Sequence, residues 1–210
     1  MPCKCKANIV PILKKSTKQD PYNNYRPVSP TVALCKVMEH VIYQSIMQHL
    51  EDKNILNSNQ HGFKKNHSCE TQLVSTIKDL VKGLDNGSEI DLQIFDFRKA
   101  FDKVPHQILL SKLYHYGIQG KKLTWINSWL TERFQRVVMD GEASSLAKVT
   151  SGVPQGTVLG PLMFLLFIND IHENINSSLR LFADYALLYR SIDTTNNCAI
   201  RQNGINKLVP

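Results

Sequence analysis

The sequence predicts an α+β fold in which a mostly antiparallel sheet packs on helices. Two N-terminal segments show helical periodicity, and alternating apolar and polar residues lead up to Asp96 as in a strand. No strand-helix-strand unit repeats along the chain, which argues against a doubly wound parallel sheet. The chain has 210 residues, 42% of them hydrophobic, so it can bury a core in one domain or two closely packed subdomains.

The N-terminal part is predicted to hold two helices, over residues 31–49 and 68–83. Residues 85–88 are predicted to form a turn, because Asp, Asn, Gly and Ser follow one another there. The alternation from Ile90 to Ile94 then predicts a strand that ends at Asp96. The apolar side of the first helix comprises Leu34, Val37, Met38, Val41, Ile42, Ile46 and Leu50.

The middle of the chain is predicted to form two more helices and a pair of strands. Gly117 and Gly120 separate the helices, and the pair Asp140-Gly141 is typical of a tight turn between strands. The predicted helices cover residues 106–116 and 121–131, and the predicted strands cover residues 136–139 and 147–150.

The segment from Ser151 to Pro161 is a loop whose residues fix its shape. Gly152 and Gly156 permit backbone conformations that other residues avoid, Pro154 stiffens the turn between them, and Pro161 suits the first turn of a helix. The side-chain amide of Gln155 can donate and accept hydrogen bonds, as a contact with a nucleotide or template strand requires. The alternative is an ordinary loop leading into a helix. The apolar run over residues 158–168 is too short to span a bilayer, so no membrane partner is expected.

Two carboxylates are predicted to meet at the end of the sheet. Asp96 ends the first predicted strand, and Asp184 lies at the tip of a hairpin with strands over residues 179–182 and 186–189. Hard oxygen ligands of this kind suit Mg²⁺ that is shared with substrate phosphates. A single Asp at a strand end can instead be a cap or turn residue.

The chain resembles the reverse transcriptase of non-LTR (LINE-type) retrotransposons over residues 9–190. The resemblance implies a right-hand polymerase with fingers over residues 1–88, a palm over residues 89–192, a polar tail over residues 193–210 and no thumb. It also implies RNA-templated DNA synthesis with an RNA template, a DNA primer, deoxynucleoside triphosphates and two Mg²⁺ ions, or Mn²⁺ in their place. Five ordered segments carry it: residues 24–29, 60–65, 94–105, 151–161 and 181–189.

The resemblance assigns catalytic roles to several positions in the palm. Asp96 and Asp184 match the metal-binding carboxylates, and the Phe97 carbonyl would assist them. Phe101 matches the bulky residue beneath the sugar of the incoming nucleotide, where it would exclude a ribose 2′-hydroxyl. The alternative for Phe101 is a core aromatic at the start of the following helix. Asp102 matches a family position too, and we interpret it as a cap or salt-bridge partner.

The same resemblance assigns substrate binding to residues of the predicted fingers and of the loop over residues 151–161. Lys14 or Lys15 and Arg26 lie where related enzymes place basic side chains on the triphosphate, because an Arg fork fits phosphate oxygens and a Lys acts as a point charge. Gln155 and Gly156 would contact the nucleotide or template. For each lysine alone, a solvated surface position is the alternative.

This chain departs from the family pattern Phe-Ala-Asp-Asp at one position, where it has Tyr185. A tyrosine offers a neutral hydroxyl on a longer arm and cannot replace a carboxylate as a metal ligand. Loss of one preorganised electrostatic group commonly lowers a rate by about 10²- to 10³-fold. We therefore expect an impaired enzyme.

Charge and cysteine content fit a nucleic-acid-binding protein of a reducing compartment. The formal net charge is +7, which favours phosphate backbones, and the odd count of 5 cysteines indicates an intracellular protein, nuclear or cytoplasmic and not secreted. Two alternatives to an active enzyme stay open at this point. One is a noncatalytic nucleic-acid-binding module, and the other is a decayed fragment of a retroelement.

Overall fold

The computed structural model describes residues 5–14 and 24–208. The chain divides into two compact units, each assembled from two stretches of sequence. Unit 1 comprises residues 1–55 and 99–167, and unit 2 comprises residues 56–98 and 168–210. These units follow packing within the chain, and the predicted division into fingers and palm between residues 88 and 89 stays a prediction.

Unit 1 contains a mixed sheet built around strands β1 (Cys5–Leu13), β2 (Tyr25–Val28) and β4 (Arg133–Met139). β1 pairs with β2 in the antiparallel sense and with β4 in the parallel sense. The short strands β5 (Glu142–Ala143) and β6 (Ala147–Lys148) pair antiparallel with β4. The sequence analysis did not predict β1 and β2. Each contains a proline, and these prolines, Pro11 and Pro27, lie opposite each other in the register.

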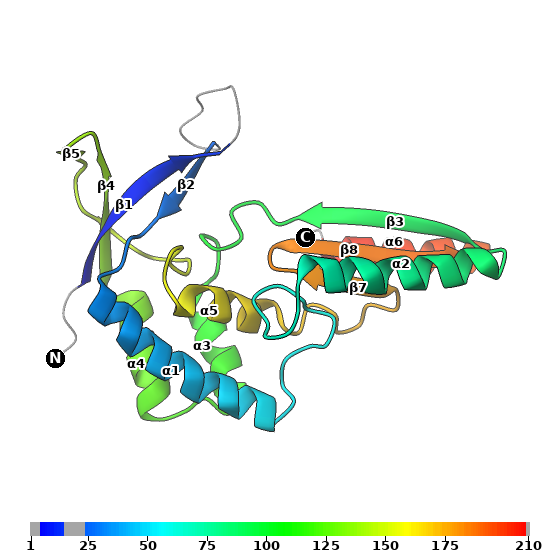
Figure 1. Ribbon diagram of the computed structural model, residues 1–210, viewed down its shortest axis with the longest axis horizontal. Coiled ribbons are helices and arrows are strands. Elements are labelled where there is room, and N and C mark those ends of the chain that lie inside the picture. Colours follow the sequence, from blue (N-terminus) through cyan, green and yellow to red (C-terminus); the bar gives the residue numbers. More distant parts are fainter. Residues whose placement is uncertain (1–4, 15–23, 209–210) are drawn as a thin grey trace. The chain divides into compact units, whose positions relative to one another are not determined.

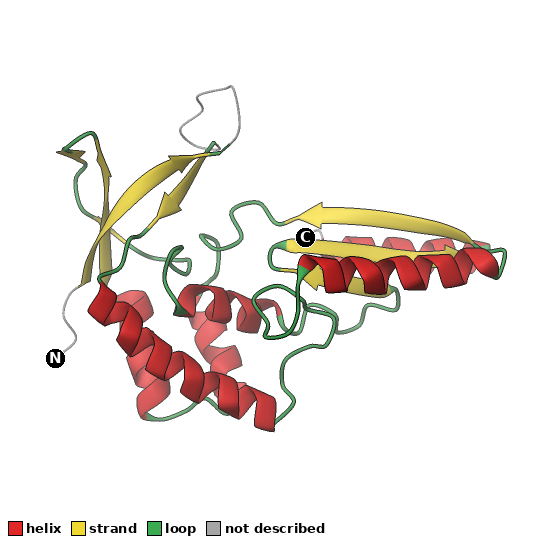
Figure 2. Cartoon of the chain, in the orientation of Figure 1, coloured by secondary structure: helices red, strands yellow, loops and turns green. Residues whose placement is uncertain are grey.

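Among the described residues, the helices of unit 1 are α1 (Ala33–Asp52), α3 (His106–His115), α4 (Lys121–Thr131) and α5 (Leu159–Ile168). Figure 2 shows the strands of this unit gathered at one end and its helices at the other. The core is apolar and centres on α5, which starts two residues before the proline that was expected to open it. Fully buried side chains include Ile46, Leu50, Leu109, Leu113, Ile126, Leu130, Leu159, Met163 and Leu166.

Only the C-terminal half of α1 packs as its apolar side predicts. Ile46 and Leu50 are buried, whereas the apolar residues of the first turns are exposed, with Leu34 at 79% and Val41 at 63%. Helical periodicity places these residues on one side of the helix, and burial then depends on whether another element covers that side.

Unit 2 is a three-stranded antiparallel sheet between two helices. β8 (Tyr185–Ile192) is central, with β3 (Glu89–Asp96) and β7 (Ser178–Phe182) on either side. Figure 1 shows α2 (Cys69–Asp85) in front of these strands and α6 (Thr195–Leu208) behind them. The α6 face carries the core, formed by Leu179, Leu181, Ala186, Leu188 and Leu208.

Helix α6 lies within the segment that was expected to be a polar tail. Residues 195–208 lack apolar periodicity in the sequence, yet they form a helix whose Ile205 and Leu208 pack on the sheet core. These apolar contacts and the 2.7 Å ion pair of Arg201 with Asp91 on β3 hold the helix against the sheet, although Gly204 lowers its intrinsic propensity.

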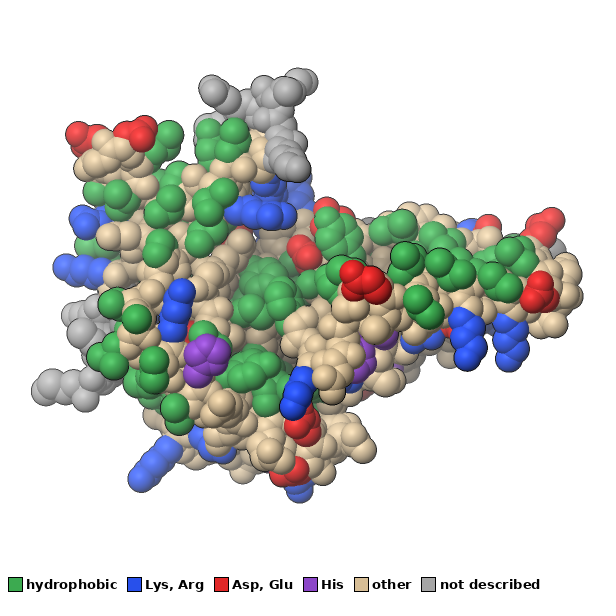
Figure 3. All heavy atoms as spheres, in the orientation of Figure 1, with side chains coloured by type: hydrophobic (Ala, Val, Ile, Leu, Met, Phe, Trp, Pro, Cys, Tyr) green, Lys and Arg blue, Asp and Glu red, His purple; other side chains and the backbone are tan. Residues whose placement is uncertain are grey.

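The face of unit 2 that carries α2 exposes many apolar side chains. Figure 3 shows them as a row along this unit. Leu92 and Ile94 of the predicted strand are 42% and 63% exposed. The exposed members on α2 are Leu73, Val74, Ile77, Val81 and Leu84.

A polar cluster joins α2 to the sheet on this face. Arg180 on β7 donates to the Asp79 carboxylate at 2.6 Å, and the Tyr189 hydroxyl on β8 donates to the same oxygen. The hydrogen bonds from Tyr189 and Arg180 hold the pKa of Asp79 below its ordinary value of 3.8. The carboxylate form therefore stabilises the folded state.

Replacing Asp79 by Asn is expected to lower the free energy of unfolding by about 1 kcal/mol at pH 7, since the pair is partly exposed and screened. The folded-state pKa of Asp79 is depressed, so this contribution is present above the unfolded-state pKa and is lost as pH falls through the folded-state value. Urea unfolding of the natural chain and of Asp79→Asn, at pH 7 and at about pH 2.5, measures this contribution. The difference in free energy of unfolding between the two proteins should shrink at acid pH. An equal difference at both pH values would contradict the assigned role of the Asp79 carboxylate. Asp85→Asn, at the exposed end of α2, is the control.

Candidate active site

Asp96 and Asp184 lie at the same end of the unit 2 sheet. Asp96 is the last residue of β3, and its register partner is Tyr185, the first residue of β8. One residue further along, the Phe97 N–H donates to the Asp184 carbonyl oxygen at 3.0 Å. The antiparallel pairing of β3 with β8 thus brings together two aspartates that are far apart in the sequence.

Tyr185 stands directly opposite Asp96 on this sheet. Directly paired residues of antiparallel strands present their side chains on the same face. Asp96 is exposed and Tyr185 is 50% exposed, so both side chains reach solvent at the sheet end. The position where the sequence pattern expects a further carboxylate therefore holds a phenol beside Asp96.

In unit 1, the loop from Ser151 to Pro161 is bound to the segment that follows Lys99. The Gly152 and Val153 N–H groups donate to the carbonyl oxygens of Val104 and Phe101, both at 2.8 Å. The buried His106 side chain forms a 2.8 Å hydrogen bond with the Gly152 carbonyl. Gly152 has φ +88, and an added Cβ would lie 2.7 Å from the Asp102 carbonyl oxygen, so the close approach requires glycine.

This loop borders a cavity of about 280 Å³ in unit 1. At its wall, the Gln155 side chain donates to the Asp102 carboxylate at 3.3 Å. Burial raises the pKa of Asp102, while the Gln155 hydrogen bond and the charges of Lys99 and Lys14 act in the opposite direction. Ser29 and Pro27 from the end of β2 line the same cavity, and the Ser29 N–H donates to the Gln155 carbonyl at 2.9 Å.

The sequence profile described as "Reverse transcriptase (RNA-dependent DNA polymerase)" matches residues 12–202 of the chain. This match covers most of the sequence and includes both aspartates and the glycine-rich loop. The chain belongs to the reverse transcriptase family.

Its relatives include polymerases of non-LTR retrotransposons. The RNA-directed DNA polymerase from mobile element jockey of Drosophila melanogaster is 30% identical over 165 residues, which are 79% of this chain and 18% of that protein. The probable RNA-directed DNA polymerase from transposon BS of the same organism is 29% identical over 200 residues, which are 88% of this chain and 21% of that protein. The chain thus spans about a fifth of the length of these relatives.

Solved structures confirm the right-hand polymerase fold of the α+β class. Telomerase from Candida albicans, in complex with a TWJ fragment of telomeric RNA, has a TM-score of 0.69 at 14% identity and covers 98% of this chain and 40% of its own. Apo telomerase from Candida tropicalis has a TM-score of 0.64 at 12% identity, covering 96% of this chain and 46% of its own.

Reverse transcriptases use divalent cations, and the donor atoms at the unit 2 sheet end suit such an ion in type. Two carboxylates, Asp96 and Asp184, and the backbone carbonyl of Phe97 are hard oxygen ligands. Within the described ranges, no group of three or more His, Cys, Asp or Glu residues could hold a metal. The binding of a metal by Asp96 and Asp184, and the effect of Tyr185 on it, stay predictions.

Phe101 of this reverse transcriptase lies against the helix core. Its ring stacks on Phe164 of α5, with centroids 4.7 Å apart and planes 19° from parallel. Phe101 remains partly exposed, whereas Phe164 is buried. The stacking agrees with the core interpretation, and the contact with a sugar stays a prediction.

Two of the predicted triphosphate ligands, Lys14 and Arg26, lie on or next to strands β1 and β2 of unit 1. Arg26 is exposed on β2 opposite Ile12, and the Lys14 N–H donates to the Asn24 carbonyl at 2.7 Å, just beyond β1. Lys14 is close enough to Asp102 to influence its pKa. Lys15 lies outside the described residues. Gly156, with φ +92, packs on the Ser29 backbone next to Gln155.

Glu39 is a site residue that the sequence analysis missed. It is buried, and its carboxylate accepts hydrogen bonds from the N–H groups of Val158 and Leu159 at 2.8 and 3.2 Å, at the start of α5. A carboxylate at a helix N-terminus is favoured by the helix dipole. Glu39 thereby anchors the loop that carries Gln155. The available signal was its position seven residues before Ile46, on the apolar side of α1.

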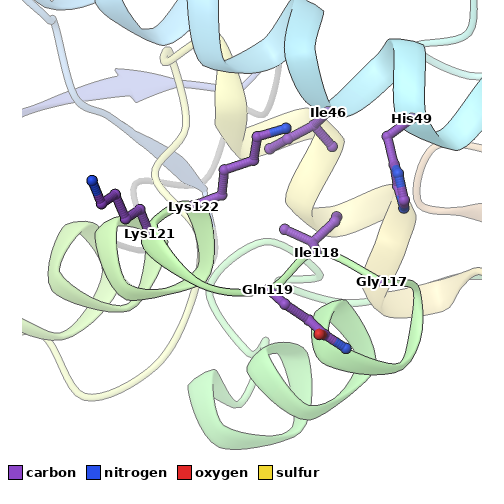
Figure 4. Close-up of a pocket in the computed structure, with 7 residues that line it drawn as sticks. All are labelled: Ile46, His49, Gly117, Ile118, Gln119, Lys121 and Lys122. Carbon is purple, nitrogen blue, oxygen red and sulfur yellow. The ribbon is translucent and has the colours of Figure 1, made fainter.

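A second cavity of unit 1, of about 330 Å³, contains none of the predicted site residues. Figure 4 shows Ile46 and His49 of α1 facing the segment before α4, with Lys122 pointing toward Ile46. His49 is held by a 2.8 Å hydrogen bond between its ring and the Tyr116 carbonyl. We assign this cavity no role in the reaction.

Proposed function

We propose that this reverse transcriptase domain extends a DNA primer on an RNA template, using deoxynucleoside triphosphates. The observation that carries the proposal is the pairing of β3 with β8, which puts Asp96 and Asp184 at one sheet end in a chain of this family. When bound there, Mg²⁺ or Mn²⁺ would activate the primer 3′-hydroxyl and neutralise the leaving pyrophosphate. Asp96, Asp184 and the Phe97 carbonyl would hold it.

The residues of unit 1 are proposed to position the nucleotide. Arg26 would fork onto phosphate oxygens, with Lys14 and Lys15 adding mobile positive charge. Gln155 and Gly156 would contact the nucleotide or the template strand, and the hydrogen bond from Gln155 to Asp102 fixes that side chain beforehand. Phe101 would exclude a ribose 2′-hydroxyl by its bulk.

Tyr185 is proposed to limit the rate. Its phenol takes the place of a negatively charged ligand on the face that Asp96 shares, so the second ion of the pair is held weakly. The net charge of +7 supports binding to nucleic acid, because lysines and arginines release counterions from phosphates. We place the protein inside the cell, on the basis of its cysteine content.

Primer extension tests this function. An RNA template, a DNA primer, deoxynucleoside triphosphates and Mg²⁺ are incubated with the natural chain and with Tyr185→Asp in matched preparations. We expect Tyr185→Asp to extend the primer about 10²- to 10³-fold faster, because it restores a carboxylate beside Asp96. Salt-sensitive binding of the primer-template without extension by either protein would contradict the proposal and favour a noncatalytic nucleic-acid-binding module.

A further inference from the structure

The segment before Gly62 runs along β7, the strand that leads to Asp184. The Leu181 N–H donates to the Asn59 carbonyl and the His61 N–H donates to the Leu181 carbonyl, both at 2.9 Å. Gln60 and Leu181 form a parallel bridge between these two hydrogen bonds. All of these residues belong to unit 2, so β7 is flanked by β8 on one edge and by this segment on the other.

The Gln60 side chain reaches from this segment to the hairpin turn. Its Oε1 accepts hydrogen bonds from the N–H groups of Gly62 at 2.7 Å and Ala183 at 3.1 Å. Gln60 is only 6% exposed, so these bonds are shielded from water. Without the Gln60 oxygen, the buried Ala183 N–H would lose this acceptor. A buried donor left without an acceptor lowers the stability of a protein by about 1–3 kcal/mol.

Ala183 needs such a restraint because its backbone is strained. It has φ +51, in the left-handed region that an alanine avoids by about 1–2 kcal/mol, and it is buried. Gly62 packs so tightly on it that an added Cβ would overlap the Ala183 nitrogen. Ala183 directly precedes Asp184, so the backbone conformation of Ala183 determines the position of the Asp184 backbone and of the carboxylate that it carries.

We propose that Gln60 is a positioning residue for Asp184. It holds the Ala183 peptide in the left-handed conformation and thereby fixes the turn that presents Asp184 next to the end of β3. This role rests on the proposed function, since Asp184 is a metal ligand only if the domain polymerises. Gln60 acts through the Ala183 backbone and touches no reacting atom. Its Nε2 has no hydrogen-bond partner among the described residues, which leaves Oε1 as the atom that matters.

Amide hydrogen exchange in the full chain measures the restraint without reference to activity. Gln60→Met keeps the length and removes the acceptor, and we expect the Ala183 and Gly62 amides to exchange about tenfold faster, as the loss of one hydrogen bond implies. Amides within β8, such as that of Leu188, should keep their exchange rates. Gln93→Met, on an exposed position of β3 in the same unit, is the matched control and should change neither amide.

Gln60→Glu assigns the effect to the acceptor oxygen. It retains an acceptor oxygen and replaces the nitrogen that has no partner with a second oxygen. The N–H groups of Gly62 and Ala183 favour the carboxylate that this creates, so the Ala183 amide should keep its slow exchange. Unchanged exchange at Ala183 in Gln60→Met, or equally fast exchange in Gln60→Glu, would overturn the positioning role.

The catalytic consequence is measured separately, in chains that also carry Tyr185→Asp. Gln60→Met should lower kcat for primer extension about tenfold, with the KM for the nucleotide unchanged, because the metal ligand and not the nucleotide contacts is disturbed. A raised KM with unchanged kcat would overturn the role. If Tyr185→Asp itself extends no primer, the proposed function fails, and the exchange rates at Ala183 still decide whether Gln60 holds the turn.

Discussion

Asp96→Asn, introduced into the Tyr185→Asp chain, should lower Mg²⁺-dependent primer extension by at least about 10²- to 10³-fold. An amide cannot supply the negative charge that a divalent cation requires, and Asp96 is the acidic residue that ends β3, directly opposite position 185. Single-nucleotide incorporation at saturating triphosphate measures the effect on kcat. A large change is expected because the substitution removes a proposed metal ligand at an exposed position, where the fold should stay in place.

Asp91→Asn is the matched control for this substitution. Asp91 lies on the same strand, but its carboxylate pairs with Arg201 of α6 at 2.7 Å, at a distance of five residues from the sheet end. We expect extension by the Asp91→Asn chain to match its parent within twofold, since partly exposed ion pairs contribute about 1 kcal/mol or less to stability. An equal loss of primer extension in the Asp96→Asn and Asp91→Asn chains would mean that Asp96 acts through the stability of the sheet.

Gly160→Ala should destabilise the protein by about 3 kcal/mol or more, which is exceptional for the addition of one methyl group. A Cβ at this position would overlap the Pro154 carbonyl oxygen and lie 2.9 Å from the Thr157 hydroxyl. Both groups are held in place, since the Thr157 hydroxyl donates to the Pro154 carbonyl at 2.9 Å and accepts from the Gly160 N–H at 3.0 Å. The loop around Gln155 cannot move aside without breaking these bonds.

Urea unfolding of Gly160→Ala and Gly204→Ala, compared with the natural chain, measures this prediction. Gly204 lies within α6, and a Cβ there would meet Leu188 at 3.4 Å, an ordinary contact. Alanine should therefore stabilise α6 by up to about 1 kcal/mol through its higher helix propensity. If Gly160→Ala lowers the free energy of unfolding only as much as an ordinary surface substitution does, the loop adapts to the added methyl group and is not fixed as described.

Elements with strong local signals were predicted from the sequence. Helix α4 starts and ends at the predicted residues, and α2 begins after Ser68, which forms a capping box with Thr71. The hairpin that carries Asp184 was predicted as well, because its strands alternate around a short turn. Strands β1 and β2 were missed, since their prolines oppose strand assignment and their pairing with each other and with β4 is invisible locally.

The residues of the candidate site also differ in how much the sequence alone says about them. Asp96, Asp184, Gln155 and Phe101 were predicted as site residues because they lie within short sequence motifs, and their roles stay predictions. The roles of Glu39 and Gln60 could not be assigned from the sequence, because the backbone groups that they bind are 119 and 123 residues away. The role of a buried polar side chain depends on the groups with which it forms hydrogen bonds, and these partners are known only once the chain is folded.

The central claim is that the end of the unit 2 sheet binds a divalent cation through Asp96 and Asp184. Titration with Mn²⁺, followed by the paramagnetic broadening of backbone amide signals in NMR spectra, tests it most directly. In the Tyr185→Asp chain, the signals of Asp96, Phe97 and Asp184 should broaden first, with weaker broadening in the natural chain and none in the chain that also carries Asp96→Asn. Broadening that persists after Asp96→Asn, or that is centred elsewhere in the protein, would contradict the claim.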